Sequence, residues 1–266
     1  MPVGRLDGKI AIVTGGGGSG IGHGISLELA RDGAHVVIIE LDLTAAESVK
    51  GLIESEGGEA SVLRGDVSDA SQVQAFTEQV IRVHRRLDIL VNSAGVGLIR
   101  PIAEVSIEEY DRLMGIDLRG VWLCSKYAIR QMQLQKEGVI INISSVHARA
   151  TMPLYGLYGA MKSGVAGLTR GIAVQYGPYG IRANTVSPGL VDGKQTRDVI
   201  GQFASNVEEW LQDFVRRDQA LPRLIQPEDI GRTVAFLASD DARSITGADL
   251  PVDAGTWAQL TSRIES

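Results

Sequence analysis

The chain has 266 residues, an apolar content of 44%, a charged content of 22% and a net charge of −6. These values are ordinary for a soluble globular protein, and they argue against nucleic acid or an anionic membrane surface as the main partner. The single cysteine, Cys124, excludes an internal disulfide and fits a reducing cytoplasm. The chain shows no signal-peptide core, no apolar run near the ~18 residues of a spanning helix, and no clustered metal ligands.

The first segment combines a short apolar run with a glycine cluster. Residues 9–14 predict a buried strand, residues 15–22 (GGGGSGIG) a loop, and residues 25–32 an amphipathic helix. Glycines let the backbone approach a pyrophosphate, and a helix N-terminus offers free N–H groups and a positive dipole end. The segment therefore predicts a dinucleotide-binding loop, with a flexible glycine turn as the alternative.

The next predicted strand, at residues 34–39, ends on an acidic residue. Glu40 lies eighteen residues after Gly22, where a carboxylate can hydrogen-bond the adenosine ribose and repel a 2′-phosphate. No Lys or Arg lies in the glycine loop or directly after Glu40. The pattern favours NAD, with NADP less favoured; the alternative for Glu40 is an exposed acid at a strand end.

Strand and helix patterns alternate from residue 9 to residue 187. Capping boxes predict helix starts at Thr44 and Ser106. Continuous apolar strands indicate burial on both faces, hence an α/β fold: a single-domain Rossmann-type, doubly wound parallel sheet of about seven strands with helices on both faces. No linker divides residues 1–266. Further strands are predicted at 59–64, 87–91, 139–143, 181–186 and within 246–255, and helices at 44–56, 69–85, 106–135 with a break at 117–120, 155–176 and 227–239.

A tyrosine and a lysine, Tyr158 and Lys162, stand one helical turn apart and follow the serine pair Ser144–Ser145. Side chains four residues apart share a helix face, and an ammonium beside a phenol lowers the phenol pKa from its reference near ~10. A phenol can then act as an acid or base near neutral pH. The motif alone could arise by chance, but the glycine loop, Glu40, Asp66, Asn92 and Ser145 all lie at predicted strand ends, where one crevice would collect them.

Taken in this order and spacing, the motifs resemble those of the classical short-chain dehydrogenase/reductase family over nearly the whole chain. The matching stretches are Thr14–Gly22, Asp66–Val67, Asn92–Gly95 with Ser93 in the second place, Tyr158 with Lys162, Pro188–Gly189 and Val252–Gly255. A serine thirteen residues before the tyrosine selects Ser145 over Ser144. The resemblance implies a cofactor-binding set of Gly16, Ser19, Gly20, Ile21, Glu40, Asp66, Val67, Asn92, Ala94, Gly95, Tyr158, Lys162, Pro188, Gly189 and Val191.

The same resemblance implies an activity and a mechanism. The expected reaction interconverts a secondary alcohol and its ketone by hydride transfer to C4 of the nicotinamide. Ser145 would hydrogen-bond the substrate oxygen, Tyr158 would exchange the hydroxyl proton, and Lys162 would lower the Tyr158 pKa and hold the nicotinamide ribose. The resemblance also implies a cytoplasmic homotetramer or homodimer, built through the helices that carry Cys124 and Tyr158 and through the C-terminal strand.

Three positions depart from the family pattern. Four residues separate Gly15 from Gly20 where the family has three, which leaves open which early glycine meets the pyrophosphate. Asp117 stands where the family has an Asn that holds a water in a proton relay through the lysine. An Asp can hold the same water while adding a negative charge. The alternative is that Asp117 is only a residue at a helix break. Gly193 replaces a Thr that often contacts the carboxamide.

The segment at about 191–221 is irregular and predicts a lid over the crevice, with a surface helix pair as the alternative. Trp210 in this lid and His147, two residues after Ser145, are the candidate substrate-pocket residues. The alternative for His147 is an ordinary loop residue. Three arginines lie near the predicted lid: Arg216, Arg217 and Arg223. They could bind a carboxylate or phosphate of the substrate, or they could form a solvated face.

Two other functions compete with an NAD-dependent alcohol dehydrogenase acting on a small-molecule substrate. A 3-oxoacyl-type reductase would usually take NADPH and would want basic residues near the adenosine phosphate, which Glu40 argues against. A non-catalytic dinucleotide sensor would tolerate loss of Ser145, Tyr158 or Lys162, yet all three are present.

Overall fold

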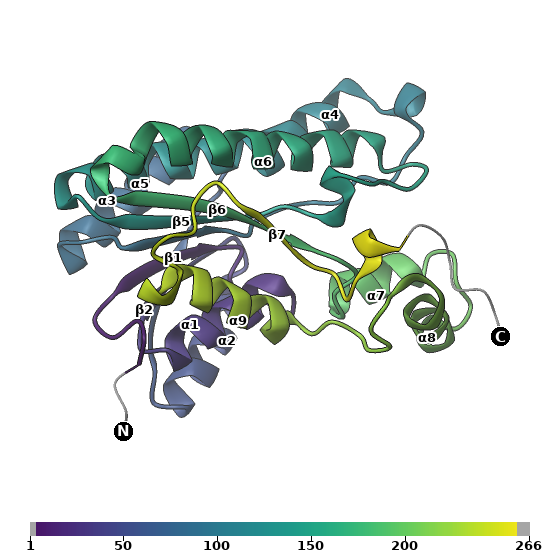
Figure 1. The fold of residues 1–266 in the computed structure, drawn as a ribbon, viewed down its shortest axis with the longest axis horizontal. Coiled ribbons are helices and arrows are strands. Elements are labelled where there is room, and N and C mark those ends of the chain that lie inside the picture. Colours follow the sequence, from purple (N-terminus) through teal and green to yellow (C-terminus); the bar gives the residue numbers. More distant parts are fainter. Residues whose placement is uncertain (1–3, 260–266) are drawn as a thin grey trace.

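The computed structural model describes residues 4–259; the two ends of the predicted domain, residues 1–3 and 260–266, lie outside the described residues. Seven parallel strands form one sheet in the order β3-β2-β1-β4-β5-β6-β7 (Figure 1). The predicted doubly wound, Rossmann-type fold is therefore confirmed. The strands are β1 (Ile10–Thr14), β2 (His35–Glu40), β3 (Glu59–Arg64), β4 (Ile89–Asn92), β5 (Gly138–Ile143), β6 (Ile181–Pro188) and β7 (Asp249–Val252).

Helices cover both faces of the sheet, because successive residues of each strand point to opposite sides. In β2, Val36 and Ile38 enter one apolar cluster while Val37 and Ile39 enter the other. Figure 1 shows the two helical layers, with α7 (Lys194–Ile200) and α8 (Val207–Asp218) beyond the end of β7. One layer holds α1 (Ile21–Arg31), α2 (Leu43–Ser55) and α9 (Pro227–Ala238); the other holds α3 (Ala70–His84), α5 (Val121–Gln135) and α6 (Gly156–Tyr176), with α4 (Ile107–Met114) leading into α5.

The strand order reverses between β1 and β4, and the loops that leave these strands meet there. Gly15 has a φ of +66°, and an added Cβ would lie 2.8 Å from the Ala94 Cα. Only glycine allows this approach without strain. The reversal creates a crevice at the carboxyl ends of the strands, which is where open α/β sheets bind ligands.

Two helix boundaries differ from those the sequence predicted. Helix α2 begins after Asp42, whose carboxylate accepts hydrogen bonds from the Thr44 N–H at 3.0 Å and the Ala45 N–H at 3.2 Å. The predicted capping box at Thr44 is therefore wrong, because the stronger N-cap precedes it by two residues. The capping box at Ser106 and Glu109 is confirmed. The break expected at 117–120 is a π-helical turn, Gly115–Gly120, that joins α4 to α5.

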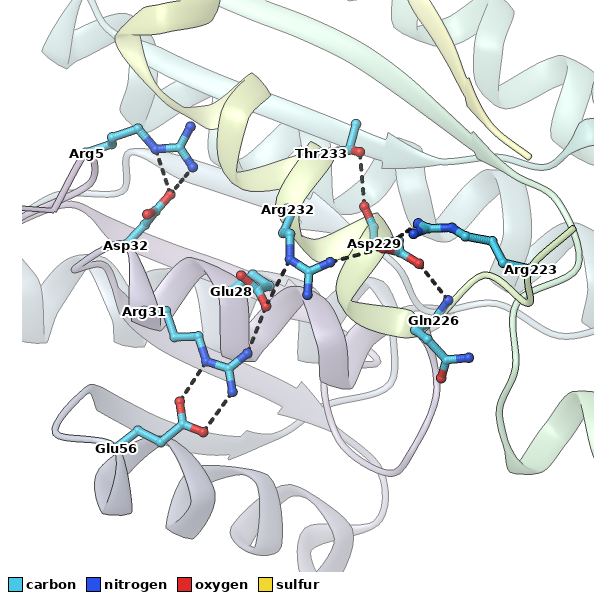
Figure 2. Close-up of polar contacts among 10 residues, drawn as sticks. All are labelled: Arg5, Glu28, Arg31, Asp32, Glu56, Arg223, Gln226, Asp229, Arg232 and Thr233. Carbon is cyan, nitrogen blue, oxygen red and sulfur yellow. Dashed lines mark hydrogen bonds and ion pairs between the residues drawn. The ribbon is translucent and has the colours of Figure 1, made fainter. Parts of the chain in front are cut away.

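Helices α1 and α9 cross at a contact between two glycines. An added Cβ at Gly231 would lie 2.3 Å from the Gly24 carbonyl oxygen. Around this crossing, Figure 2 shows a network in which Arg31 bridges Glu28 and Glu56 and in which Asp229 pairs with Arg223 and Arg232. Partly exposed ion pairs contribute little individually, so the close backbone contact mainly sets the α1–α9 geometry.

Between residues 4 and 259, no helix is long and apolar enough to cross a membrane. Within that range, no group of three or more His, Cys, Asp or Glu side chains is placed to hold a metal ion.

Replacing Gly231 by Ala should lower the free energy of unfolding by about 1–3 kcal/mol, because an added methyl group would force the two helices apart. Urea denaturation of the purified protein measures this change. The matched control is Gly51→Ala on α2, where an added Cβ meets no atom within 4 Å. That control should be neutral or stabilising by up to about 1 kcal/mol, since alanine is preferred over glycine in a helix. Equal stability of the two variants would contradict the glycine contact.

Candidate active site

The two consecutive serines after β5 have different partners. The Ser144 hydroxyl donates to the Lys162 backbone carbonyl at 2.9 Å and so fixes the start of α6. The Ser145 hydroxyl oxygen accepts a hydrogen bond from the His147 N–H at 3.2 Å. Because Ser144 is committed to α6, Ser145 is the serine with a hydroxyl proton left to donate, in agreement with the predicted choice.

The Lys162 ammonium is buried among groups that can hold a positive charge. Its side chain lies in the first turns of α6, is 6% exposed, and places Nζ 2.9 Å from Asp117 Oδ2. Nζ also donates to the Ile143 carbonyl at 3.3 Å and lies 5.5 Å from the centre of the Tyr158 ring. Burial acts to lower the pKa of Lys162, but Tyr158 in its ionised form and the Asp117 carboxylate outweigh it and leave that pKa raised. The lysine therefore stays charged at neutral pH.

Asp117 is fully buried in the π-helical turn that precedes α5. Its Oδ1 accepts the Val96 N–H at 2.8 Å, while its Oδ2 faces the Lys162 ammonium. The acid that replaces the family's Asn thus joins the loop after β4 to the helix that carries Tyr158. This pairing places Asp117 in the Tyr158–Lys162 group as predicted, and its role in a proton relay stays a prediction.

The glycine loop divides into a buried part and an exposed part. An added Cβ at Gly16 would lie 2.8 Å from the Ser26 hydroxyl, so this glycine serves packing between β1 and α1. Its expected contact with the pyrophosphate is not supported, because Gly16 is buried while Gly18 and Ser19 are exposed. Ser19, Gly20 and Ile21 stand at the start of α1, where free N–H groups suit an anion.

The adenosine end of the crevice carries the predicted acids and one basic residue that sequence reasoning missed. Glu40 ends β2, and Asp66 and Val67 directly follow β3. The register of the sheet places Arg64 beside Glu40 on the neighbouring strand. Arg64 is exposed and makes no ion pair within the described residues. Strand alignment alone brings it there, since it stands 24 positions after Glu40 in the sequence.

The Asn92 side chain points away from the crevice. Its amide nitrogen donates to Asn142 Oδ1 at 2.7 Å and to the Ser125 hydroxyl at 3.3 Å, within the core. Only the Asn92 backbone is left for the predicted cofactor contact. The next residues do face the crevice: the Ala94 N–H donates to the Thr14 hydroxyl, and Gly95 lies beside Asp117 and Lys162.

The end of β6 leads from the sheet into the lid. Pro188 ends the strand, the Gly189 N–H donates to the Val252 carbonyl at 3.0 Å, and Val191 pairs with Ile225 in an isolated bridge. An added Cβ at Gly193 would lie 3.2 Å from the Ser19 carbonyl oxygen. The lid therefore begins against the glycine loop.

His147 stands beside the catalytic candidates, as predicted. Its ring stacks on Tyr155 with centroids 4.3 Å apart and meets the Tyr158 ring edge-on at 5.7 Å. Its Nδ1 lies 3.0 Å from the Thr151 hydroxyl. Burial lowers the pKa of His147, so the ring is neutral at pH 7. Tyr155 is a member of this group that sequence reasoning missed, although its position three residues before Tyr158 is a usable signal.

The predicted lid is a pair of helices, α7 (Lys194–Ile200) and α8 (Val207–Asp218). Trp210 packs between Phe203 and Phe214, with ring centroids 5.7 and 5.5 Å away, so its contacts lie within the lid. The structure thus does not bring Trp210 into contact with the Tyr158 group. The three arginines near the lid pair with neighbouring acids, which supports the solvated-face interpretation: Arg216 with Asp213, Arg217 with Asp218 and Arg223 with Asp229.

Sequence reasoning also missed Trp257, which follows β7. Its indole N–H donates to the Val146 carbonyl at 2.7 Å, and its ring lies 4.6 Å from the Arg149 guanidinium carbon. The C-terminal segment therefore anchors the loop that carries Ser145 and His147. No local pattern signals this contact, because it joins positions 111 residues apart.

Three features define the site as that of a nucleotide-binding oxidoreductase: the reversed strand order, the glycine loop that leads into α1, and the group of Ser145, Tyr158 and Lys162. Comparison with known proteins agrees with this class. A family model described as enoyl-(acyl carrier protein) reductase matches residues 16–256. The chain is 36% identical to a D-threitol dehydrogenase of Mycolicibacterium smegmatis, with 94% of each protein covered. It is 34% identical to a meso-2,3-butanediol dehydrogenase of Serratia marcescens, with 96% of each covered.

A solved structure extends the likeness to three dimensions. The crystal structure of a short-chain dehydrogenase/reductase from Burkholderia xenovorans superimposes with a TM-score of 0.91 at 31% identity, covering 96% of this chain and 99% of that one. The chain belongs to the short-chain dehydrogenase/reductase family of oxidoreductases. Its Rossmann fold within that family implies a nicotinamide dinucleotide as cofactor.

Replacing Asp117 by Asn should lower the free energy of unfolding by about 1–3 kcal/mol, because a carboxamide cannot accept from both the Val96 N–H and the Lys162 ammonium without opposing one donor with another. Thermal and urea unfolding measure the loss. Asp111→Asn, an exposed acid on α4, removes the same charge without a buried partner and should change stability by less than about 0.5 kcal/mol. Equal stability of wild type and Asp117→Asn would show that the ion pair contributes nothing.

Proposed function

We propose that this protein is an NAD-dependent oxidoreductase that interconverts a secondary alcohol and its ketone. The observation that carries the proposal is the buried Lys162 ammonium held 5.5 Å from the Tyr158 ring centre, with Ser145 at the end of the adjacent strand. A phenol, a fixed cation and a free hydroxyl at one crevice are the groups that proton exchange at a carbinol oxygen requires.

The residues at the switch point fit a dinucleotide. The Gly15–Ala94 approach and the exposed start of α1 leave backbone N–H groups for a pyrophosphate, and Glu40 lies where the adenosine ribose is expected. Asp66, Val67, Gly95, Pro188 and Val191 complete the proposed binding set. The nicotinamide, when bound, accepts or supplies a hydride at C4.

Side chains of the protein bind the substrate oxygen and exchange the substrate hydroxyl proton. Ser145 donates a hydrogen bond to the substrate oxygen and orients it, and Tyr158 takes the substrate hydroxyl proton in oxidation and returns it in reduction. Lys162 places a permanent positive charge beside the phenol oxygen as it loses its proton. Asp117 holds that ammonium in place through the 2.9 Å ion pair, and we include it in the relay that returns the proton to solvent.

The proposed substrate is a secondary alcohol of a small polyhydroxy compound. Two relatives carry names of dehydrogenases for threitol and for meso-2,3-butanediol, both of which are diols or polyols. The neutral His147 beside Tyr158 offers a polar ring for such a substrate. We further propose that the enzyme is a homotetramer or homodimer, because α5 and α6 expose the apolar side chains of Trp122, Leu134 and Val174. We also propose a cytoplasmic location, which fits the single cysteine, Cys124.

One observation favours a second candidate, a 3-oxoacyl-type ketoreductase that uses NADPH. Arg64 lies beside Glu40 in the sheet and could meet a 2′-phosphate. Glu40 opposes that reading, because its carboxylate would repel the phosphate. A dinucleotide sensor without catalysis is the least favoured, since Ser145, Tyr158 and Lys162 are all in place.

Replacing Tyr158 by Phe should reduce kcat by about 10²–10⁴-fold, because it removes the proton-exchanging hydroxyl. NADH binding, followed by fluorescence, should change only a few-fold. Tyr179→Phe, on the exposed turn after α6, is the control and should keep full turnover. Preserved turnover in Tyr158→Phe with lost NADH binding would overturn the assignment. A pH–rate profile unchanged in Asp117→Asn would place Asp117 outside the relay.

Replacing Glu40 by Ser should raise the ratio of kcat/KM for NADP to that for NAD by about tenfold or more, because it removes the repelling carboxylate and leaves Arg64 as the charged neighbour. Initial rates with both cofactors on a panel of secondary alcohols measure the ratio. The double variant Glu40→Ser/Arg64→Ala should lose that gain. A wild-type preference for NADP would instead favour the reductase candidate.

A further inference from the structure

The glycine loop is one residue longer than the family pattern. It leaves the core at Gly16 and is buried again at Gly22, and Gly17 and Gly18 are the first residues beyond the core. Gly18 has a φ of +77°, and an added Cβ there would meet no atom within 4 Å. Gly18 is therefore the exposed apex of the loop, and Gly17 is the residue that contacts the rest of the protein.

Gly17 lies against the end of β2 and the first turn of α2. An added Cβ at Gly17 would lie 3.0 Å from Glu40 Cγ and 3.1 Å from the Ala46 nitrogen. The Gly17 N–H donates to Glu40 Oε2 at 3.3 Å, and the Leu41 N–H donates to Glu40 Oε1 at 2.8 Å. One carboxylate thus ties the lengthened loop to the backbone at the end of β2.

The hydrogen bond from Gly17 to Glu40 is the one polar contact that the described residues offer to Gly17 and Gly18. Glycines have no side chains to pack, and fixing a residue's backbone costs roughly 1–2 kcal/mol of conformational entropy. The nearby N-terminus of α2 cannot replace the anchor, because the Asp42 carboxylate already caps it. Arg64 forms no ion pair with Glu40 among the described residues, so the carboxylate remains available to Gly17.

We propose that Glu40 is a positioning residue for the lengthened glycine loop as well as a ligand for the adenosine ribose. The inference rests on the proposed function only in taking this loop as the pyrophosphate-binding loop. If the Glu40 side chain holds both the glycine loop and the adenosine ribose, then loss of its carboxylate also weakens binding of the nicotinamide half of the cofactor.

The first test needs no cofactor. Hydrogen–deuterium exchange of peptides that contain residues 15–20 is compared for wild type, Glu40→Ala, Glu40→Gln and Glu47→Ala. Exchange at Gly17 should be about tenfold faster in Glu40→Ala, because a hydrogen bond to a charged acceptor is lost. Glu40→Gln keeps an acceptor oxygen and should exchange more slowly than Glu40→Ala. Glu47→Ala removes an exposed acid of α2 whose one ion pair within residues 4–259 is with Lys50, and should match wild type.

The second test separates the effect of Glu40 on the glycine loop from its contact with the adenosine ribose. Reduced nicotinamide mononucleotide lacks the adenosine half and cannot touch Glu40, so any loss of its affinity must act through the loop. Its dissociation constant should rise several-fold in Glu40→Ala and stay unchanged in Glu47→Ala. Unchanged exchange at Gly17 in Glu40→Ala, or unchanged affinity for the mononucleotide, would overturn the positioning role. A wild type that binds no NADH would overturn the proposed function but leave the exchange result valid.

Discussion

Burial of the Lys162 charge is the constraint around which the site is built. An ammonium removed from water is costly unless a partner charge and further acceptors replace its hydration. The structure supplies Asp117 Oδ2 at 2.9 Å and the Ile143 carbonyl at 3.3 Å. Asp117 can reach the lysine because it lies in a π-helical turn, and Ser144 fixes the lysine's own backbone. Four separate elements are therefore held in register by one charge.

The crevice itself depends on backbones that approach closely. The contact of Gly15 with Ala94 joins the loops of two adjacent strands, and an added Cβ at Gly22 would lie 1.9 Å from the Gly15 carbonyl oxygen. The same device recurs where Gly24 meets Gly231, which sets α9 and, through Arg223 and Asp229, the exit of the lid against α1. Glycines thus fix the first turn of α1 against the loop after β1 and against α9.

The sequence patterns predicted the fold, because apolar periodicity is a local property. The structure brings Lys162 together with Asp117 and Tyr158, and the catalytic roles of these residues and of Ser145 stay predictions. What could not be predicted depends on strand register and side-chain direction. Arg64 lies opposite Glu40 because of the parallel register of β2 and β3, and Asn92 turns into the core because Asn142 and Ser125 lie there. Trp257 meets Val146 only once the C-terminal segment has folded back.

The two acids of the site illustrate how surroundings decide what a carboxylate does. Asp117 faces a cation, so the pair presents little net charge to a bound ligand. Glu40 accepts from two backbone N–H groups and pairs with no cation among residues 4–259, so its negative charge still acts on whatever binds at the end of β2. Hydrogen bonds from neutral donors order a carboxylate without cancelling its charge. The charge of Glu40 therefore remains exposed to a ligand, whereas the charge of Asp117 is balanced by Lys162.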